Sequence, residues 1–284
     1  MAKFEILSKN VADTATLSGG GWVTSLSLLN LQNKQYHKRA RSLSLNASDT
    51  QLIAVFAKAE LINVVGLRSH NGSNGGRIKV TASNNSDFSS PLLVKEQDIW
   101  KPWFFPTDRP IESENWLSGK PTDAEKEIYP SIFLYKLDSL IKAQYWKFEI
   151  IDPDNTKGYF ESGRLFMGVS WSLPIDMIDP PTITPVEVIK SDSSIGGQEY
   201  IQSFYKYRLL SFTLLGTKSD IFKKFNDMQM NIGVLDEILV IPDPDDDQNE
   251  IREVFIGRIK ELSELTPLTK QSHYTTKVTI KELL

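Results

Sequence analysis

Hydrophobic residues in the first half of the chain recur at every second position in two segments, 77–81 and 145–151. The apolar members of these segments are Ile78, Val80, Trp146, Phe148 and Ile150. Such alternation is typical of a strand with one buried and one solvent-facing side in an antiparallel sheet. Two further strand-like runs occupy residues 51–57 and 62–67, and turns rich in Gly, Asn and Asp separate the runs. The pattern predicts an antiparallel β-sandwich of the jelly-roll kind.

Helical patterns are rare in this half. Residues 123–128 predict a short helix that Thr122 caps, with Glu125 completing a capping box. Residues 134–141 predict a loop or another helix. Residues 98–120 combine several aromatic side chains with prolines, which predicts a long irregular insertion and not a strand.

The composition changes between Ser172 and Gln198, where four prolines precede a run rich in Ser and Gly. Proline blocks ladder pairing and Gly loosens the chain. We therefore expect a linker over 173–200, between a β-sandwich domain at 1–172 and a small accessory domain at 201–284. The accessory domain is expected to be β-rich with one helix over 218–230, and its strand-like runs are 205–215, 238–241, 253–259 and 275–280.

Composition narrows the chemistry that the chain can perform. With 32 basic and 36 acidic residues its formal charge is -4, so it lacks the basic footprint of a nucleic-acid-binding protein. No apolar run approaches the roughly 18 residues of a membrane span, and the start does not resemble a secretion signal, so we expect cytoplasmic synthesis. The absence of Cys excludes thiolate nucleophiles and Cys-based metal sites. With only three His residues, a His-based catalytic triad has few ways to form. We therefore expect no catalytic residue, no cofactor and no enzyme.

Two acidic turns are weak candidates for a metal site. Asp152, Asp154 and Asn155 lie in one turn, and Asp245 and Asp247 lie in the other. Closely spaced carboxylate and amide oxygens could hold Ca²⁺. The second turn lacks the Gly and the final Glu of an EF-hand loop, and Pro/Asp turns between strands are usually solvated loops. We therefore expect both turns to be loops without metal, the first being the stronger candidate.

The aromatic insertion is the other candidate site, through Trp100, Trp103, Phe104 and Trp116. Exposed aromatic faces suit the apolar faces of sugar rings. The same residue types are also enriched in cores and at the centres of subunit interfaces. We favour burial or subunit contact over a sugar platform.

Three stretches of the first half resemble the galactose-binding-like (discoidin-type) jelly rolls of tailed-bacteriophage virion proteins. They are residues 64–71, 78–89 and 145–168, and the last is the most specific. Within it, Gly163 and Gly168 flank a short apolar strand, where a bulge or a close backbone approach is expected. The resemblance covers about residues 20–172.

This resemblance implies a structural protein of the virion, located in the distal tail or baseplate. Its expected partners are other tail or baseplate proteins and further copies of itself, arranged as a ring around the tail axis. The family fold often binds carbohydrate, so the alternative is an adhesin that binds a host surface glycan. The second half is similar to the small accessory β domains of phage tail proteins, but no motif there names a family.

Overall fold

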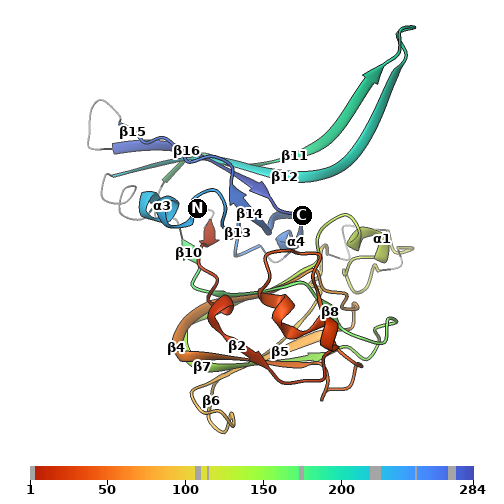
Figure 1. Cartoon of the computed structure of the whole chain (residues 1–284), viewed down its shortest axis with the longest axis vertical. Coiled ribbons are helices and arrows are strands. Elements are labelled where there is room, and N and C mark those ends of the chain that lie inside the picture. The colour runs from red at the N-terminus through yellow and green to blue at the C-terminus, as the bar shows by residue number, and fades with distance from the viewer. Residues whose placement is uncertain are drawn as a thin grey trace.

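A computed structural model describes residues 4–105, 110–113, 115–172, 176–217, 225–246, 248–267 and 273–284. Two sheets are stacked one above the other in Figure 1, and a long hairpin projects from the upper one. Every strand pairing among the described residues is antiparallel. The prediction of a mainly β, antiparallel fold is confirmed.

The lower sheet carries the strands that alternation predicted. Its order is β2-β4-β7-β5-β6, with β9 added beside β4. The strands are β2 (Thr16–Ser18), β4 (Gln51–Arg68), β5 (Arg77–Ser83), β6 (Pro91–Asp98), β7 (Ile132–Ile151) and β9 (Arg164–Gly168). A separate two-stranded sheet joins β3 (Ala40–Arg41) and β8 (Glu161–Ser162).

The expectation of a loop or helix over 134–141 is wrong, because these residues belong to β7. Ile132, Phe133 and Leu134 are all buried, so the strand has no free face at its start. A strand covered on both sides reads as a continuous apolar run and loses the alternation that identifies strands. The predicted capping box is confirmed at α1 (Asp123–Lys126), where Thr122 and Glu125 exchange hydrogen bonds.

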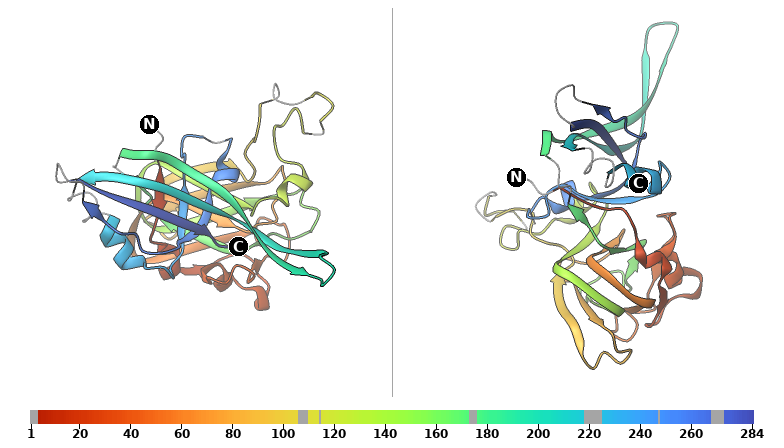
Figure 2. Two further views of the ribbon diagram at one scale, coloured as in Figure 1. Left: turned by 90° about the horizontal axis from the view of Figure 1, so that it is seen from above. Right: turned by 90° about the vertical axis from the view of Figure 1, so that its left-hand side faces the viewer.

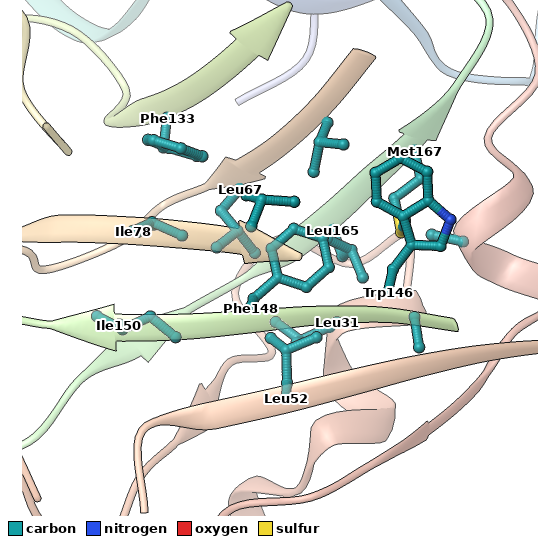
Figure 3. Close-up of a cluster of buried hydrophobic side chains, with 14 of the residues drawn as sticks. Leu31, Leu52, Leu67, Ile78, Phe133, Trp146, Phe148, Ile150, Leu165 and Met167 are labelled. Carbon is teal, nitrogen blue, oxygen red and sulfur yellow. The ribbon is translucent and has the colours of Figure 1, made fainter. Parts of the chain in front are cut away.

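The lower core lies between the sheet and a layer of 3₁₀ turns. These turns are η1 (Val11–Thr14), η2 (Thr24–Leu26) and η3 (Leu28–Gln32). Figure 3 shows Trp146 and Phe148 of β7 facing Leu165 and Met167 of β9, and Leu31 of η3 belongs to the same cluster. Trp146 and Phe148 have no exposed surface. Each large side chain buried in this way contributes roughly 1.5–3 kcal/mol to folding, so the alternating face of β7 anchors this half.

The upper sheet has the order β10-β1-β13-β14-β16-β12-β11, and β15 pairs with β16. Its strands are β1 (Glu5–Leu7), β10 (Trp171–Ser172), β11 (Asp176–Ser193), β12 (Glu199–Thr217), β13 (Ile238–Ile241), β14 (Phe255–Ile259), β15 (Thr266–Pro267) and β16 (His273–Glu282). Its short helices are α3 (Asp227–Ile232) and α4 (Glu250–Glu253). A helix was predicted over 218–230. Its first seven residues, 218–224, lie outside the described residues, and residues 227–230 form the first part of α3.

Within the stretch predicted to be a linker, 173–200, the described residues form the edge strand β11, a turn and the start of β12. β11 pairs with β12 along nearly its whole length, with bulges near Asp179 and Val188. Pro181 and Pro185 fit this strand because β11 is the last strand of the sheet, where a missing N–H on the outer side costs no ladder bond. The domain boundary near residue 172 stays a prediction, although β1 pairs with β13 across it.

The two sheets are joined by an apolar layer and a buried ion network. Leu239 and Ile256 of the upper sheet pack against Val64 and Phe166 of the lower one. Beside them, Arg164 of β9 has no exposed surface and binds two carboxylates. It meets Asp13 of η1 at 2.5 Å and also Glu237, which precedes β13. Because Glu237 belongs to the upper half, this network fixes one sheet upon the other.

The predicted close approach at the end of β9 is present. A Cβ placed on Gly168 would lie 2.6 Å from the carbonyl oxygen of Lys9. Only glycine admits this contact, which brings the segment after β1 against β9.

Candidate functional site

The most unusual surface of the molecule is the outer part of the β11–β12 hairpin, residues 186–207, which we call the hairpin arm. Figures 1 and 2 show it extending away from the body of the protein. No residue of the arm is buried. β12 pairs with β16 only from Leu209 onward, so within the arm both outer edges lack a described partner strand. Unpaired strand edges of this length are templates for another chain.

Apolar side chains gather on the arm although nothing described covers them. Five apolar residues of the arm are between 48% and 63% exposed, and Ile195 at the tip is fully exposed. The five are Ile189, Tyr200, Ile201, Phe204 and Tyr205. Large apolar residues grouped in this way mark a protein-contact surface more often than a solvated one.

The strand register gives the arm one apolar face. Residues opposite each other in the register share a face, so Val186, Val188, Tyr205 and Tyr207 form one apolar face. The rings of Tyr205 and Tyr207 lie 6.3 Å apart. A bulge at Val188 and Ile189 leaves Phe204 without a residue opposite it.

Hydrogen bonds hold the arm in shape. The Ser203 hydroxyl donates a hydrogen bond to the Glu187 carboxylate at 2.5 Å, and the Ser191 hydroxyl donates one to Glu199 at the same distance. These side-chain hydrogen bonds connect β11 to β12. At the tip, Gly197 has φ +80° and donates its N–H to the Ser194 carbonyl. A glycine in this conformation closes a short hairpin loop.

The aromatic insertion is part of the body of the protein. Trp100, Trp103 and Phe104 are 2%, 4% and 7% exposed, which agrees with the favoured interpretation of burial and leaves no exposed sugar platform at these three residues. Trp103 meets Tyr129 edge to face, and the guanidinium of Arg252, a residue of α4, lies over the ring of Trp103. The insertion therefore packs against the second half of the same chain. Trp116 is half-buried, and its role stays a prediction.

A hollow of about 710 Å³ lies at the loop end of the lower sandwich. It is lined by the turn after β4, the turn after β7 and the segment around α1, including His70, Trp100, Lys126 and Asn155. His70 is 5% exposed and meets Trp100 edge to face. Its Nδ1 accepts a hydrogen bond from the Gly72 N–H, so the ring proton belongs on Nε2. That donor has no partner among the described residues, which makes the hollow a candidate binding site.

Acidification is expected to reveal the burial of His70. Burial, aided by Lys126, lowers the pKa of His70 from 6.5 to about 3. The folded protein therefore favours the neutral ring, while the unfolded chain takes up a proton below pH 6.5. The free energy of unfolding should fall by on the order of 1 kcal/mol per pH unit between pH 6 and pH 4 through this group. Urea unfolding of the native protein and of His70→Gln at several pH values measures it; equal slopes for both proteins would contradict this account.

In the turn at 152–155, hydrogen bonds within the protein occupy the carboxylate of Asp152. The Asp152 carboxylate is buried and accepts bonds from the Ser73 N–H and hydroxyl and from the Asn155 amide. The Asn155 amide also donates to the Asn71 carbonyl, while Asp154 is exposed. The carboxylate is therefore engaged in tying two loops together.

The acidic turn at 242–250 lies at the end of β13. Asp245 is exposed, and Asp247 lies outside the described residues. Hydrogen bonds from Asn249 and Gln248 lower the pKa of Asp246 and keep it charged. Glu250 is buried and forms an ion pair with Lys101 at 2.5 Å. Across the described part of the chain, no group of three or more His, Asp or Glu side chains is placed to hold a metal.

Comparisons with known proteins give distant likenesses only. No protein-family model matches the sequence, and no curated protein matches it. Among solved structures, the chain is similar to the module CBM32-1 from a family 31 glycoside hydrolase of Clostridium perfringens, with TM-score 0.38 and 13% identity, covering 57% of this chain and 99% of the module.

Two further structures show a likeness of the same order. Chitosan-binding module 1 of a chitosanase/glucanase from Paenibacillus sp. IK-5 has TM-score 0.36 and 11% identity over 57% of this chain and 99% of its own. Reduced XRCC1 bound to the DNA pol beta catalytic domain has TM-score 0.32 and 14% identity over 54% and 91%. With TM-scores this low, these likenesses carry no conclusion about ligands or partners.

Sequence reasoning missed the two most unusual features of the surface. The arm was hidden because the prolines that precede it and the two glycines at its tip are typical of a linker, although residues 199–207 alternate weakly and could have suggested a strand. The hollow was hidden because its lining comes from three separate loops.

Within the described residues, no helix is long and apolar enough to cross a bilayer.

Proposed function

We propose that the protein is a structural, non-enzymatic assembly component that binds neighbouring subunits through its hairpin arm. The observation that carries this proposal is the arm itself, with two unpaired edges and a set of exposed apolar side chains. Natural proteins blunt or cover exposed edge strands, because an open edge invites pairing with other chains. A partner that covers the arm would complete both its edges and its apolar faces.

Within this class, we propose a tail or baseplate protein of a tailed-bacteriophage virion, assembled in several copies around the tail axis. The support is the resemblance of residues 64–71, 78–89 and 145–168 to virion jelly rolls, together with the arm. A compact body with one protruding hairpin suits a closed assembly, since each copy offers one arm to one neighbour. Such head-to-tail contacts close into rings when the rotation between copies allows it.

The mass of the protein in solution tests this proposal. Light scattering over a range of concentrations is expected to give a defined multiple of 32.2 kDa that forms as the concentration rises. Addition of a panel of bacterial surface glycans should leave this mass unchanged. A chain that stays monomeric at every concentration would contradict self-assembly through the arm.

The second candidate function is carbohydrate binding, favoured by the loop-end hollow. Its wall includes the polar side chains of Ser73, Lys126 and Asp154, which can exchange hydrogen bonds with sugar hydroxyl groups. A monomer that binds one glycan, detected in the same light-scattering samples by tryptophan fluorescence, would favour this function over assembly.

A further inference from the structure

The hairpin arm leaves the body of the protein at one cross-strand pair, in which Pro185 of β11 lies opposite Arg208 of β12. The ladder between β12 and β16 begins one residue later, where Leu209 pairs with Lys281. From Arg208 toward the tip, no residue of the arm is buried. The pair of Pro185 and Arg208 is therefore the last place at which the body can control the direction of the arm.

Arg208 is 7% exposed, although it lies at the base of an exposed hairpin. Its Nε and Nη2 each donate to one carboxylate oxygen of Glu282, the last residue of β16. The same carboxylate accepts the backbone N–H of Arg208 at 2.8 Å. Two parallel bonds between a guanidinium and a carboxylate fix the geometry as well as the distance. Glu282 therefore holds both the side chain and the backbone of Arg208.

The guanidinium of Arg208 also contacts other parts of the body. Its Nη1 donates to the carbonyl oxygen of Arg252, a residue of α4, at 2.6 Å. The group lies 5.1 Å from the ring centre of Phe255, the first residue of β14, and 5.6 Å from that of Tyr129, which packs on the lower core. One side chain at the root of the arm is thus tied to β16, α4, β14 and the segment that follows α1.

Neighbouring residues restrict the same place in the hairpin. The ring of Pro185 fixes its own φ, so β11 is stiff directly opposite Arg208. In the first cross-strand pair of the arm, Lys281 of β16 places its ammonium group 4.2 Å from the ring centre of Tyr207. Both strands of the hairpin are therefore restrained where they leave the body.

We propose that Arg208 is a positioning residue of the assembly surface: together with Glu282 it holds the arm at one angle to the body, so that the arm meets a neighbouring subunit already aimed. This inference rests on the proposed assembly function and adds the device that prepares the arm for its partner. A surface that is oriented before contact loses less conformational entropy on binding. If the arm had the competent direction only about one-tenth of the time, the apparent dissociation constant would rise about tenfold.

The variant that tests this role replaces both partners, Arg208→Met together with Glu282→Leu. It leaves no buried charge unpaired, and apolar replacement of a whole buried pair often leaves stability unchanged or raises it. Its free energy of unfolding in urea should therefore be no lower than that of the native protein. In sedimentation measurements the dissociation constant of the assembly should nevertheless rise about tenfold.

The direction of the arm can be measured directly, because the chain contains no Cys and spin labels attach only at introduced cysteines. Ile195→Cys places one label at the fully exposed tip, and Lys260→Cys places the other at an exposed position just after β14. Pulsed electron paramagnetic resonance of dilute samples should give one narrow distance distribution for the otherwise native chain. The double variant should give a clearly broader one.

The matched control removes another ion pair by the same kind of change, Lys136→Met together with Glu5→Leu. This pair joins β7 to β1, and β13, β14 and β16 lie between β1 and β12 in the upper sheet. The control should alter neither the assembly nor the distance distribution. If the Arg208 and Glu282 double variant loses stability, Arg208→Lys provides the same test, because it keeps the charge but not the two parallel bonds.

The outcomes separate this inference from the function on which it rests. An arm that keeps its narrow distribution without the pair would overturn the positioning role, as would an arm that moves while assembly is unchanged; in both cases the assembly function stands. A native protein that is monomeric at every concentration would refute the assembly function and, with it, the role of Arg208.

Discussion

Replacing Ile201 and Phe204 by serine is expected to abolish assembly while the monomer keeps its native stability. These side chains are 63% and 54% exposed in the single chain, so their loss leaves no cavity in the core. Surface changes of this kind alter the free energy of unfolding by less than about 0.5 kcal/mol. At the centre of an interface, however, each such apolar anchor contributes about 2 kcal/mol or more, so the double variant should weaken association about a thousandfold.

The measurement is sedimentation velocity beside thermal unfolding of the same samples. Ile128→Ser is the matched control, because Ile128 is 66% exposed but lies just after α1, away from the arm. The control should assemble normally. A double variant that assembles as the native chain does would show that the arm has another role.

Arg164→Met is expected to produce the largest loss of stability of any single substitution considered. The arginine has no exposed surface, and its removal leaves the carboxylates of Asp13 and Glu237 without their cation. Breaking one side of a buried ion network typically costs 3–5 kcal/mol, because the remaining charges stay desolvated. Urea unfolding at pH 7 should show a loss of this order.

Lys34→Met is the comparison that separates the effect of burial on the free energy of unfolding from the effect of losing an ion pair. Lys34 and Asp236 also join the two halves, at 2.6 Å, but their side chains are 56% and 48% exposed. An exposed pair of this kind contributes about 0–1 kcal/mol, so this variant should unfold nearly as the native protein does. Equal losses in the two variants would indicate that distance, and not desolvation, determines the contribution.

Local patterns predicted much of the architecture. The alternation in residues 145–151 identified the main core strand, and Thr122 with Glu125 marked the start of α1. The expectation of a close backbone approach at Gly168 came from one glycine beside one apolar strand. In each case the signal and the structure lie within a few residues of each other, where propensity and periodicity act.

Long-range contacts explain what the sequence did not predict. The burial of Arg164 requires Asp13 and Glu237, which lie far away in the chain, and nothing near residue 164 indicates them. Trp103 sits in an irregular segment, where no period distinguishes an inward from an outward side chain. Prolines hid β11, because their tolerance depends on its edge position in a sheet that only the folded chain defines.

The pairing of β1 with β13 has a consequence for the order of events during synthesis. Glu5–Leu7 leaves the ribosome before every other described strand, but its partner Ile238–Ile241 is synthesised more than 200 residues later. At ordinary translation rates the first strand waits for tens of seconds without a partner. During that time the lower sandwich can fold, because its own sheet needs no later strand than β9. The upper sheet is then completed last, when β13 has been synthesised and pairs with β1.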